Sequence, residues 1–496
     1  MTPATDPPLA WDPAPLCDRI RALIAQARPA LPPGPTADGL DATTGRLAEP
    51  TLRVAVGGRL KAGKSTLINA LAGQRIAPSA QTECTKLVAW YRASHQNRVE
   101  VRLRDGAGRV VPGRPGGGVP DDLAGLGAPI TEVLDLRVEV VNPTLAQRYS
   151  IVDTPGTQSL SGLDEAALAA LADADALVYV MPLPDENDRE ALEALRRNAP
   201  AAMSAANVIG VISRIDQLGA GPDPWPEARA LAASYNRRLR GLVRTTVPVI
   251  GLLAQTAAGP EWTEADTRLV GRLAAAAAAD PAEYAQNTET ERDFRRWSPG
   301  PLDGADRDRL LGALGLYGLT EAVRVWREGA RSPAGLRAAL HDRSGIRPLL
   351  DVLDDCLIAP ADRLRAAGAL HRLERLRDTA DGAALQVLDG LLDRLSEVRA
   401  DPRLLQAGLS PALADLAAGR LALPEPDAQA LVALATGGSP ADCLGLPAGA
   451  SAEQLTRRAD EAVDRWRRLE YGSSRLVAQR AREALEVCQV MFFGAG

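Results

Sequence analysis

The sequence predicts an α/β fold in which a doubly wound, mostly parallel sheet is followed by an α-helical bundle. β-rich runs alternate with helical runs from Thr51 to about Leu253, which is the pattern of parallel strands joined by crossover helices. From Leu350 onward the apolar runs have helical spacing. One such stripe consists of Leu388, Leu391, Leu392, Leu395 and Val398. We therefore divide the chain into an α/β domain over residues 51–349 and a helical domain over residues 350–496.

The residues before Thr51 are expected to lie outside the sheet. Residues 1–13 are rich in proline and are predicted to be disordered. Within residues 14–31 apolar side chains return at helical spacing, so we expect a helix that packs on the helical bundle. The Pro, Gly and Asp content of residues 32–50 predicts a linker.

The α/β domain opens with a loop whose spacing is that of a phosphate-binding site. Gly58, four further residues and then Gly63-Lys64-Ser65 stand between a strand pattern and a helical pattern. Glycines let successive backbone N–H groups point at phosphate oxygens, and the start of the helix adds partial positive charge. Lys64 would reach the β- and γ-phosphates, and the Ser65 hydroxyl would bind Mg²⁺. The residues expected to contact the nucleotide here are Gly58, Lys61, Ala62, Gly63, Lys64, Ser65 and Thr66.

A second apolar run ends in Asp153-Thr-Pro-Gly156. Asp153 would hold Mg²⁺ through a water molecule, and the Gly156 amide would sense the γ-phosphate. A strand that ends in Asp and a Pro-Gly turn is also common loop chemistry, but the phosphate loop that precedes it favours the nucleotide role. The sequence therefore predicts binding of a nucleoside triphosphate together with Mg²⁺.

A third apolar run has the pattern of a buried strand and ends in Ser213-Arg-Ile-Asp216. This motif indicates which base of the nucleotide the protein binds. GTPases place N/T-K-x-D at this position, where the Asp carboxylate accepts hydrogen bonds from the ring N–H and the exocyclic amine of guanine. Adenine lacks that pair of donors. Asp216 fits the role, and Arg214 replaces the Lys that packs on the base, which a planar guanidinium can also do. Ser213 matches the pattern less well, yet the order of the three motifs favours GTP over ATP.

The overall composition limits the class of protein. A formal net charge of −6 argues against a dedicated nucleic-acid binder, whose affinity depends on phosphate neutralisation. The five cysteines are scattered without a C-x-x-C pair, so we expect reduced thiols in a cytoplasmic protein. Residues 1–35 lack the apolar core of a signal peptide, and no stretch of about 18 apolar residues occurs. Any contact with a membrane should be peripheral.

Four segments together resemble the bacterial dynamin-like GTPases. They are the run L-K-A-G-K-S-T-L-I-N-A-L, a proline followed seven residues later by a threonine (Pro78 and Thr85), D-T-P-G and S-R-I-D. The likeness is strongest to the branch that contains the shorter member of the isoniazid-inducible pair and its sporulation-associated relatives. It implies a dynamin-type GTPase domain over residues 51–349 and a neck or stalk over residues 350–496. The C-terminal part of the neck also resembles the helical hairpin of J-domains, without their His-Pro-Asp loop.

The resemblance also implies roles for individual residues. The sequence alone leaves Thr82 and Thr85 as candidates for the switch threonine. The resemblance selects Thr85, with its hydroxyl on Mg²⁺ and its carbonyl on the attacking water. Lys61 replaces a small polar residue of eukaryotic dynamins, and it either stabilises transition-state charge or is a solvated loop lysine. The segment after the guanine motif would contribute Leu252, Leu253 and Ala254 to the nucleotide site.

On function, the resemblance implies GTP hydrolysis that drives peripheral membrane remodelling or repair at the inner face of the cell membrane. It implies pairing of two copies through their GTPase faces and a second dynamin-like protein as partner. Anionic lipid would be contacted by residues 403–423 or by Met491–Phe493. Two alternatives stay open, an Era-type GTPase that acts in ribosome assembly and a slow GTP-dependent scaffold. An acidic chain without a basic RNA-binding module disfavours the ribosomal role.

Overall fold

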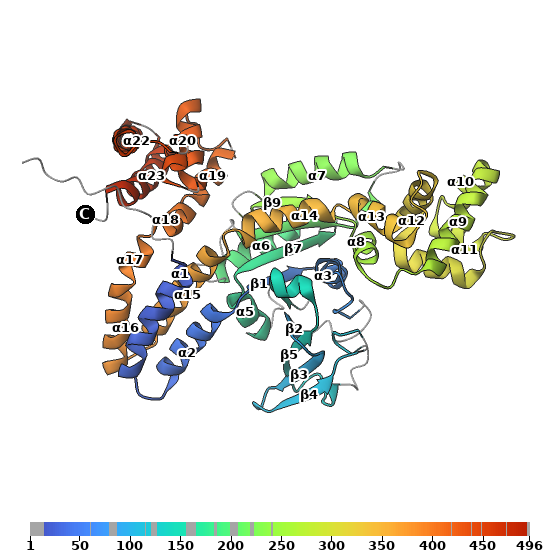
Figure 1. The fold of residues 1–496 in the computed structure, drawn as a ribbon, viewed down its shortest axis with the longest axis horizontal. Coiled ribbons are helices and arrows are strands. Elements are labelled where there is room, and N and C mark those ends of the chain that lie inside the picture. The colour runs from blue at the N-terminus through green and yellow to red at the C-terminus, as the bar shows by residue number, and fades with distance from the viewer. Residues whose placement is uncertain are drawn as a thin grey trace, which may run out of the picture.

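The computed structural model shows an elongated molecule with helical units at both ends of a central sheet (Figure 1). The described residues are 14–59, 61–78, 87–114, 116–120, 126–154, 165–182, 186–198, 207–218, 223–239, 242–417, 419–437, 439–447, 449–472 and 474–493. The predicted disorder of residues 1–13 concerns a segment outside this part of the chain.

Within the described residues the central sheet has nine strands in the order β4-β3-β5-β2-β6-β1-β7-β8-β9. The strands are β1 (Leu52–Gly58), β2 (Val88–Ala93), β3 (Arg98–Leu103), β4 (Gly108–Pro112), β5 (Val133–Val140), β6 (Tyr149–Asp153), β7 (Ala176–Pro182), β8 (Val208–Ser213) and β9 (Thr245–Pro248). Strands β6, β1, β7, β8 and β9 run parallel, as do β2 and β5, whereas β2 is antiparallel to β6 and β3 is antiparallel to β5 and β4. The predicted doubly wound, mostly parallel sheet is confirmed.

Helices cover both faces of the sheet because successive side chains of a buried strand point to opposite faces. In β1, Val54 and Val56 pack into the core on one face and Ala55 into the core on the other. The covering helices are α3 (Lys64–Ala72) and α14 (Ile346–Leu353) on the first face, and α5 (Glu165–Ala172), α6 (Glu186–Asn198) and α7 (Trp225–Arg238) on the second. The chain enters at β1 and builds strands on both sides of it, so the carboxyl end of β1 lies at a topological switch point.

The α/β domain extends further along the chain than predicted. The π-helical turn η7 (Asp354–Ile358) continues α14. The apolar side chains that this segment places in the core of the sheet are those of Ile346, Leu349, Leu353 and Leu357. The predicted boundary at residue 349 was therefore wrong. One continuous helical stripe crosses it, and the spacing alone does not show on which domain the stripe packs.

A helical unit lies beyond one end of the sheet, and its core continues into β8 and α7 (Figure 1). Its helices are α8 (Gly251–Ala258), α9 (Glu264–Ala279), α10 (Pro281–Asn287), α11 (Glu291–Arg296), α12 (Gly304–Arg327) and α13 (Pro333–Arg343). Gly315, with φ of 65°, interrupts the helical backbone of α12. α8 joins this unit to the sheet, because it follows β9 and contacts α3.

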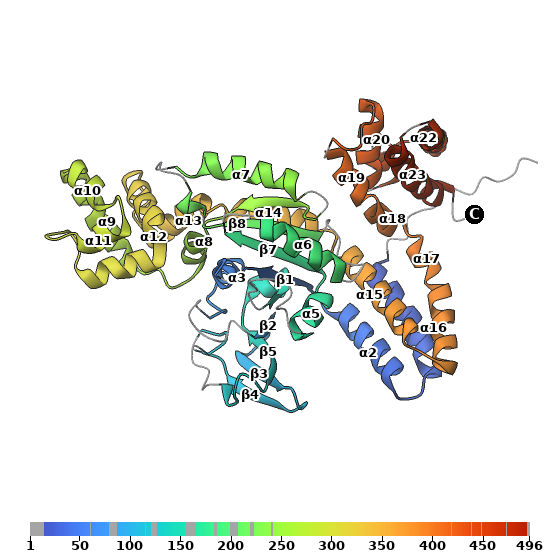
Figure 2. The same cartoon turned by 180° about the vertical axis from the view of Figure 1, so that it is seen from behind.

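A helical bundle that contains the N-terminal helices stands at the opposite end of the sheet (Figure 2). Its helices are α1 (Leu16–Ala27), α2 (Pro35–Ala48), α15 (Ala361–Asp378) and α16 (Gly382–Arg394). The prediction of a linker over residues 32–50 was wrong. Pro35 occupies the first turn of α2, where its missing N–H has no intrahelical partner to lose. Ala37, Leu40 and Leu47 are buried in the bundle core.

A second helical unit follows the bundle and is reached through α17 (Ser396–Arg399). Its helices are α18 (Pro402–Gly408), α19 (Ser410–Ala417), α20 (Glu425–Thr436), α21 (Pro440–Cys443), α22 (Ala452–Gly472) and α23 (Arg475–Phe493). Leu409 and Leu421 are buried in its core, so the prediction that residues 403–423 offer apolar side chains to lipid is wrong for these two leucines. Phe493 is 51% exposed, whereas Met491 is buried. None of the helices in the described ranges is long and apolar enough to cross a membrane.

Candidate functional site

The turn between β1 and α3 requires glycine at two places. Gly58 has a φ of 138°, and a Cβ atom there would lie 2.2 Å from the carbonyl oxygen of Val180 on the neighbouring strand β7. Gly63, with a φ of 90°, is in the left-handed region immediately before Lys64, the first residue of α3. The loop therefore closes at the N-terminus of α3, where unpaired backbone N–H groups favour an anion.

Lys64 is held inside this loop. Its Nζ atom donates to the carbonyl oxygens of Gly58 at 3.3 Å and Arg59 at 3.1 Å, and its side chain is almost fully buried. Burial lowers the pKa of Lys64, and the charge of Asp153 opposes that shift. The two carbonyl oxygens hold the ammonium inside the loop, and its contact with phosphate stays a prediction.

Asp153 ends β6 and lies beside Val56 of β1 in the strand register. Burial raises the pKa of Asp153 to about 7, and the charge of Lys64 acts in the opposite direction. The next residue, Thr154, is fixed by a hydrogen bond from its Oγ1 atom to the carbonyl oxygen of Val56 at 3.0 Å. The carboxylate is thus a buried group whose charged form needs a nearby cation.

Mg²⁺ fits the donor set at this place. The Ser65 hydroxyl in the first turn of α3 and the Asp153 carboxylate at the end of β6 are oxygen donors of the kind that Mg²⁺ prefers. A divalent cation would also compensate the buried negative charge that raises the pKa of Asp153. The predicted metal residues Ser65 and Asp153 therefore suit Mg²⁺ chemically.

The guanine motif is joined to the phosphate loop by Ser213. The Ser213 Oγ atom lies 2.7 Å from the carbonyl oxygen of Ala62 and 3.2 Å from that of Met181. Ser213 is buried, so a small hydroxyl serves here as a clamp between the two loops. A hydroxyl is enough for this contact, so Ser213 can stand where Thr is usual.

Arg214 and Asp216 follow on the short helical turn η6 (Ile215–Gln217). Arg214 is exposed and adopts a left-handed backbone with φ of 56° and ψ of 32°. Asp216 is partly buried, and this burial raises the pKa of its carboxyl, while its own backbone N–H and the charge of Arg214 lower it. An exposed planar cation and a half-buried carboxylate thus stand two residues apart, and their recognition of guanine stays a prediction.

The predicted base-side residues occupy the start of α8. Leu253 and Ala254 are fully buried, and Leu252 is partly exposed. Leu252 lines a cavity of about 500 Å³ together with Ser65 and Thr66 of α3. The side chains of Leu253 and Ala254 thus belong to the core, and a contact from their backbone to the nucleotide stays a prediction.

Asn69 is a residue that the sequence analysis missed. Its Oδ1 atom accepts the backbone N–H groups of Ile76 and Ala77, both at 2.8 Å, and its Nδ2 atom donates to Gln255 Oε1 at 3.1 Å. Asn69 therefore fixes α3, α8 and the start of the segment that leads to the switch loop. A polar residue on the otherwise apolar face of α3 is the signal that could have revealed it.

The structure describes only some of the remaining predicted residues. Lys61 is exposed in the phosphate loop with φ of 60°, and Ala62 is fully buried beside it. Thr85 and its alternative Thr82 lie outside the described residues, and so does Gly156. Their assigned roles stay predictions.

The comparisons with known proteins agree with this geometry. A family model described as "50S ribosome-binding GTPase" matches residues 53–209. The isoniazid-induced protein IniC of Mycobacterium tuberculosis, in strains CDC 1551 / Oshkosh and ATCC 25618 / H37Rv, is 35% identical over 382 residues, which cover 73% of this chain and 75% of IniC. The chain belongs to the bacterial dynamin-like GTPases. The resemblance predicted from the four sequence segments is confirmed.

Solved structures of an oligomerised bacterial dynamin pair also align with this dynamin-like GTPase. One has a TM-score of 0.34 and 13% identity, over 96% of this chain and 60% of that chain. The other has a TM-score of 0.36 and 11% identity, over 97% and 88%. The chain spans about 60% of the length of the first of them. Era of Aquifex aeolicus gives a TM-score of 0.21 and 18% identity over 40% of this chain and 51% of Era. Membership in the family rests on the match to IniC.

Proposed function

We propose that this dynamin-like GTPase binds GTP with Mg²⁺ and hydrolyses it to GDP and phosphate, to drive peripheral membrane remodelling or repair at the inner face of the cell membrane. The observation that carries the nucleotide part is the meeting of three motifs at one edge of the sheet. Lys64 follows β1, Asp153 ends β6 and Ser213 ends β8. The carboxyl ends of parallel strands share an edge, and α/β sheets bind ligands there.

Each residue has a definite task in this proposal. Lys64 would exchange its two carbonyl acceptors for phosphate oxygens. Ser65, Thr85 and Asp153 would hold Mg²⁺, which neutralises phosphate charge when it is bound. The Thr85 carbonyl would orient the attacking water, and the Gly156 amide would detect the γ-phosphate.

Assembly is the second part of the proposal. Two copies would pair through their GTPase faces, and a second dynamin-like protein would act with them on anionic lipid. Lys61 is exposed in the phosphate loop, where an ammonium can stabilise charge that develops in the transition state. Pairing would order the loops around that charge.

Sedimentation with anionic liposomes and a GTP turnover assay test the proposal together. We expect nucleotide-dependent pelleting, and specific activity that rises with protein concentration or with the partner. Lys61→Ala should lower the stimulated rate without removing GTP affinity. Turnover without pelleting, even with the partner present, would support a scaffold. Pelleting with ribosomal particles instead of liposomes would support the Era-type alternative.

A further inference from the structure

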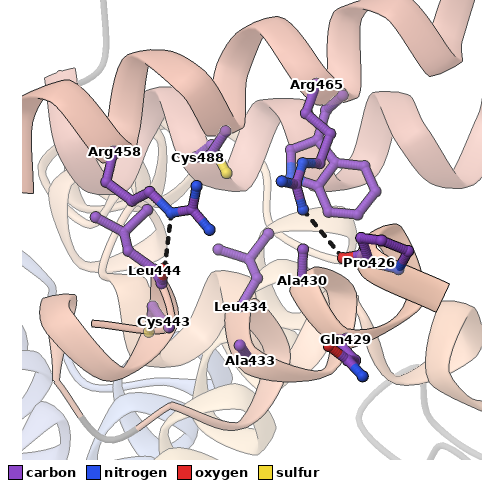
Figure 3. A pocket seen from close by; sticks show the side chains of 13 residues that line it. Pro426, Gln429, Ala430, Ala433, Leu434, Cys443, Leu444, Arg458, Arg465 and Cys488 are labelled. Atoms are coloured by element: carbon purple, nitrogen blue, oxygen red, sulfur yellow. Dashed lines mark hydrogen bonds between the residues drawn. The ribbon is translucent and has the colours of Figure 1, made fainter. Parts of the chain in front are cut away.

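A cavity of about 300 Å³ lies inside the C-terminal helical unit, between α20, α22 and α23 (Figure 3). Its volume is at the lower end of the range of small-molecule sites in proteins. The walls combine polar side chains, among them Gln429, Arg458 and Arg465, with apolar ones. The apolar part is formed by Ala433, Leu434, Leu444, Ala462 and Trp466, among others. Leu434 and Trp466 are almost fully buried. Alanines along two facing helices leave the space that larger side chains would fill.

Two thiols complete the apolar wall. Cys443 and Cys488 both line the cavity and are buried. Burial raises the pKa of each thiol to about 12, so both are uncharged at neutral pH. Gln406 donates from Nε2 to the carbonyl oxygens of Leu434 at 3.1 Å and Gly437 at 3.0 Å, and this atom lies 3.2 Å from Cys443 Sγ. This side of the cavity is therefore fixed before any ligand arrives.

Two arginines stand over the cavity from α22. Arg458 and Arg465 are seven residues apart, which places them on one face of the helix. Arg458 donates from Nε to the carbonyl oxygen of Leu444 at 3.4 Å, and Arg465 donates from Nη1 to that of Pro426 at 3.1 Å, as the dashed lines in Figure 3 show. Both guanidinium groups are thereby held against the walls of the cavity.

The arginines have acidic neighbours outside the cavity. Arg458 Nη1 lies 2.7 Å from the Glu461 carboxylate, and Arg465 Nε lies 3.6 Å from the Asp427 carboxylate. A guanidinium carries five N–H donors, and the contacts in the described part of the chain involve Nε and Nη1 of each side chain. Donors on both arginines thus remain to meet an anionic group above the apolar part of the cavity.

We propose that this cavity takes one acyl chain whose acidic head group, a carboxylate or a phosphate, is held by Arg458 and Arg465. The volume equals that of about ten water molecules at liquid density, which suits a chain of medium length. The ligand is a free fatty acid or the tail of an anionic phospholipid, since both combine the same two chemical features. The inference deepens the membrane part of the proposed function and does not depend on GTP hydrolysis.

Calorimetric titration of the full chain with decanoate tests the site. We expect saturable binding to one site and at least a tenfold loss of affinity in the double variant Arg458→Gln, Arg465→Gln. Arg457→Gln, an exposed residue of the same helix, is the matched charge control and should bind like the wild type. Decanol has the chain without the charge and should bind the wild type and the double variant equally.

Filling the cavity gives a second, independent test. Ala462→Phe and Ala430→Leu each place a larger side chain in the cavity and should abolish decanoate binding, with unchanged helix content by circular dichroism. Vesicles of phosphatidylglycerol that compete with decanoate would identify a membrane lipid as the source, and vesicles that do not compete would identify a free fatty acid. Absence of saturable decanoate binding by the wild type, or undiminished binding by both filled variants, would overturn the inference. GTP turnover without lipid, measured on the same preparations, reports separately on the nucleotide part of the proposed function.

Discussion

The Lys64 ammonium and the Asp153 carboxylate share one buried corner of the phosphate loop, and each stabilises the charged form of the other. Burial has the larger effect on both groups, because it lowers the pKa of Lys64 and raises the pKa of Asp153 to about 7. Because this carboxyl group ionises only near neutral pH, the binding of metal and nucleotide should depend on the release of its proton.

Binding of GTP with Mg²⁺ should strengthen as the pH rises from about 6 to 8. Below a pKa of about 7 the Asp153 carboxyl must lose its proton before it meets a cation, so apparent affinity should fall by about tenfold per pH unit on the acid side. Calorimetry in buffers of different ionisation enthalpy measures the released proton. Asp153→Asn should release none, and a wild type whose affinity does not change with pH would contradict the assignment.

The same group should reduce the stability of the nucleotide-free protein at neutral pH. Its folded pKa of about 7 lies above the ordinary value of 3.8, so the folded state holds more protons between these two values. The contribution of Asp153 to the free energy of unfolding therefore falls as the pH rises through that window. Asp153→Asn should stabilise the protein at pH 7.5 by a few kcal/mol, on the order of one per pKa unit, in denaturant unfolding. At pH 3.5 the variant and the wild type should unfold alike.

Variants of Asp216 and Lys64 should have different effects, the first on the selectivity for guanine and the second on phosphate binding. Asp216→Asn presents an amide N–H₂ to the donors of guanine and should weaken GTP while it leaves weak binding of ATP unchanged. Lys64→Ala removes the buried ammonium of the loop and should abolish binding of both nucleotides. Competition with a fluorescent GTP analogue measures both effects. Equal affinity of the wild type for ATP and GTP would refute the guanine assignment.

Thr85 should matter more for turnover than for binding. If its hydroxyl and carbonyl act mainly in the transition state, Thr85→Ala should lower kcat by about two orders of magnitude with a smaller change in KM. Thr82→Ala is the matched control from the same loop and should behave like the wild type. The opposite result, with Thr82→Ala impaired and Thr85→Ala active, would move the switch residue by three positions.

The sequence predicts those parts of the candidate site that depend on local spacing. The phosphate loop and the order of the three motifs are fixed by neighbours in the chain, so Lys64, Asp153 and Asp216 could be predicted. The clamp from Ser213 to Ala62 could not, because it joins residues that meet only after β1 and β8 enter the same sheet. The helix α2 was mistaken for a linker because Pro, Gly and Asp outweighed its sparse apolar stripe, whose partners lie on α1 and α15.

A buried ion pair lies where the N-terminal bundle meets the sheet, a place that we call the joint. Arg46 of α2 forms an ion pair with Asp175, just before β7, and only 4% and 1% of the two side chains are exposed. Asp175 also accepts the backbone N–H of Arg53 at 2.8 Å, so one carboxylate ties α2 to the start of β1.

Arg46→Met leaves the buried Asp175 carboxylate without its arginine and should reduce the free energy of unfolding by about 3–5 kcal/mol. Asp175→Leu should cost less, because Arg46 keeps the partly exposed Glu49 carboxylate as a partner at 2.7 Å. The double variant should recover much of the loss, since no unpaired charge then stays buried. Arg28→Met breaks an ion pair with Asp41 whose side chains are 33% and 57% exposed, and it should change stability little. If the two single variants unfold at the same denaturant concentration as the Arg28→Met control, the joint is held by its apolar contacts and not by the buried pair.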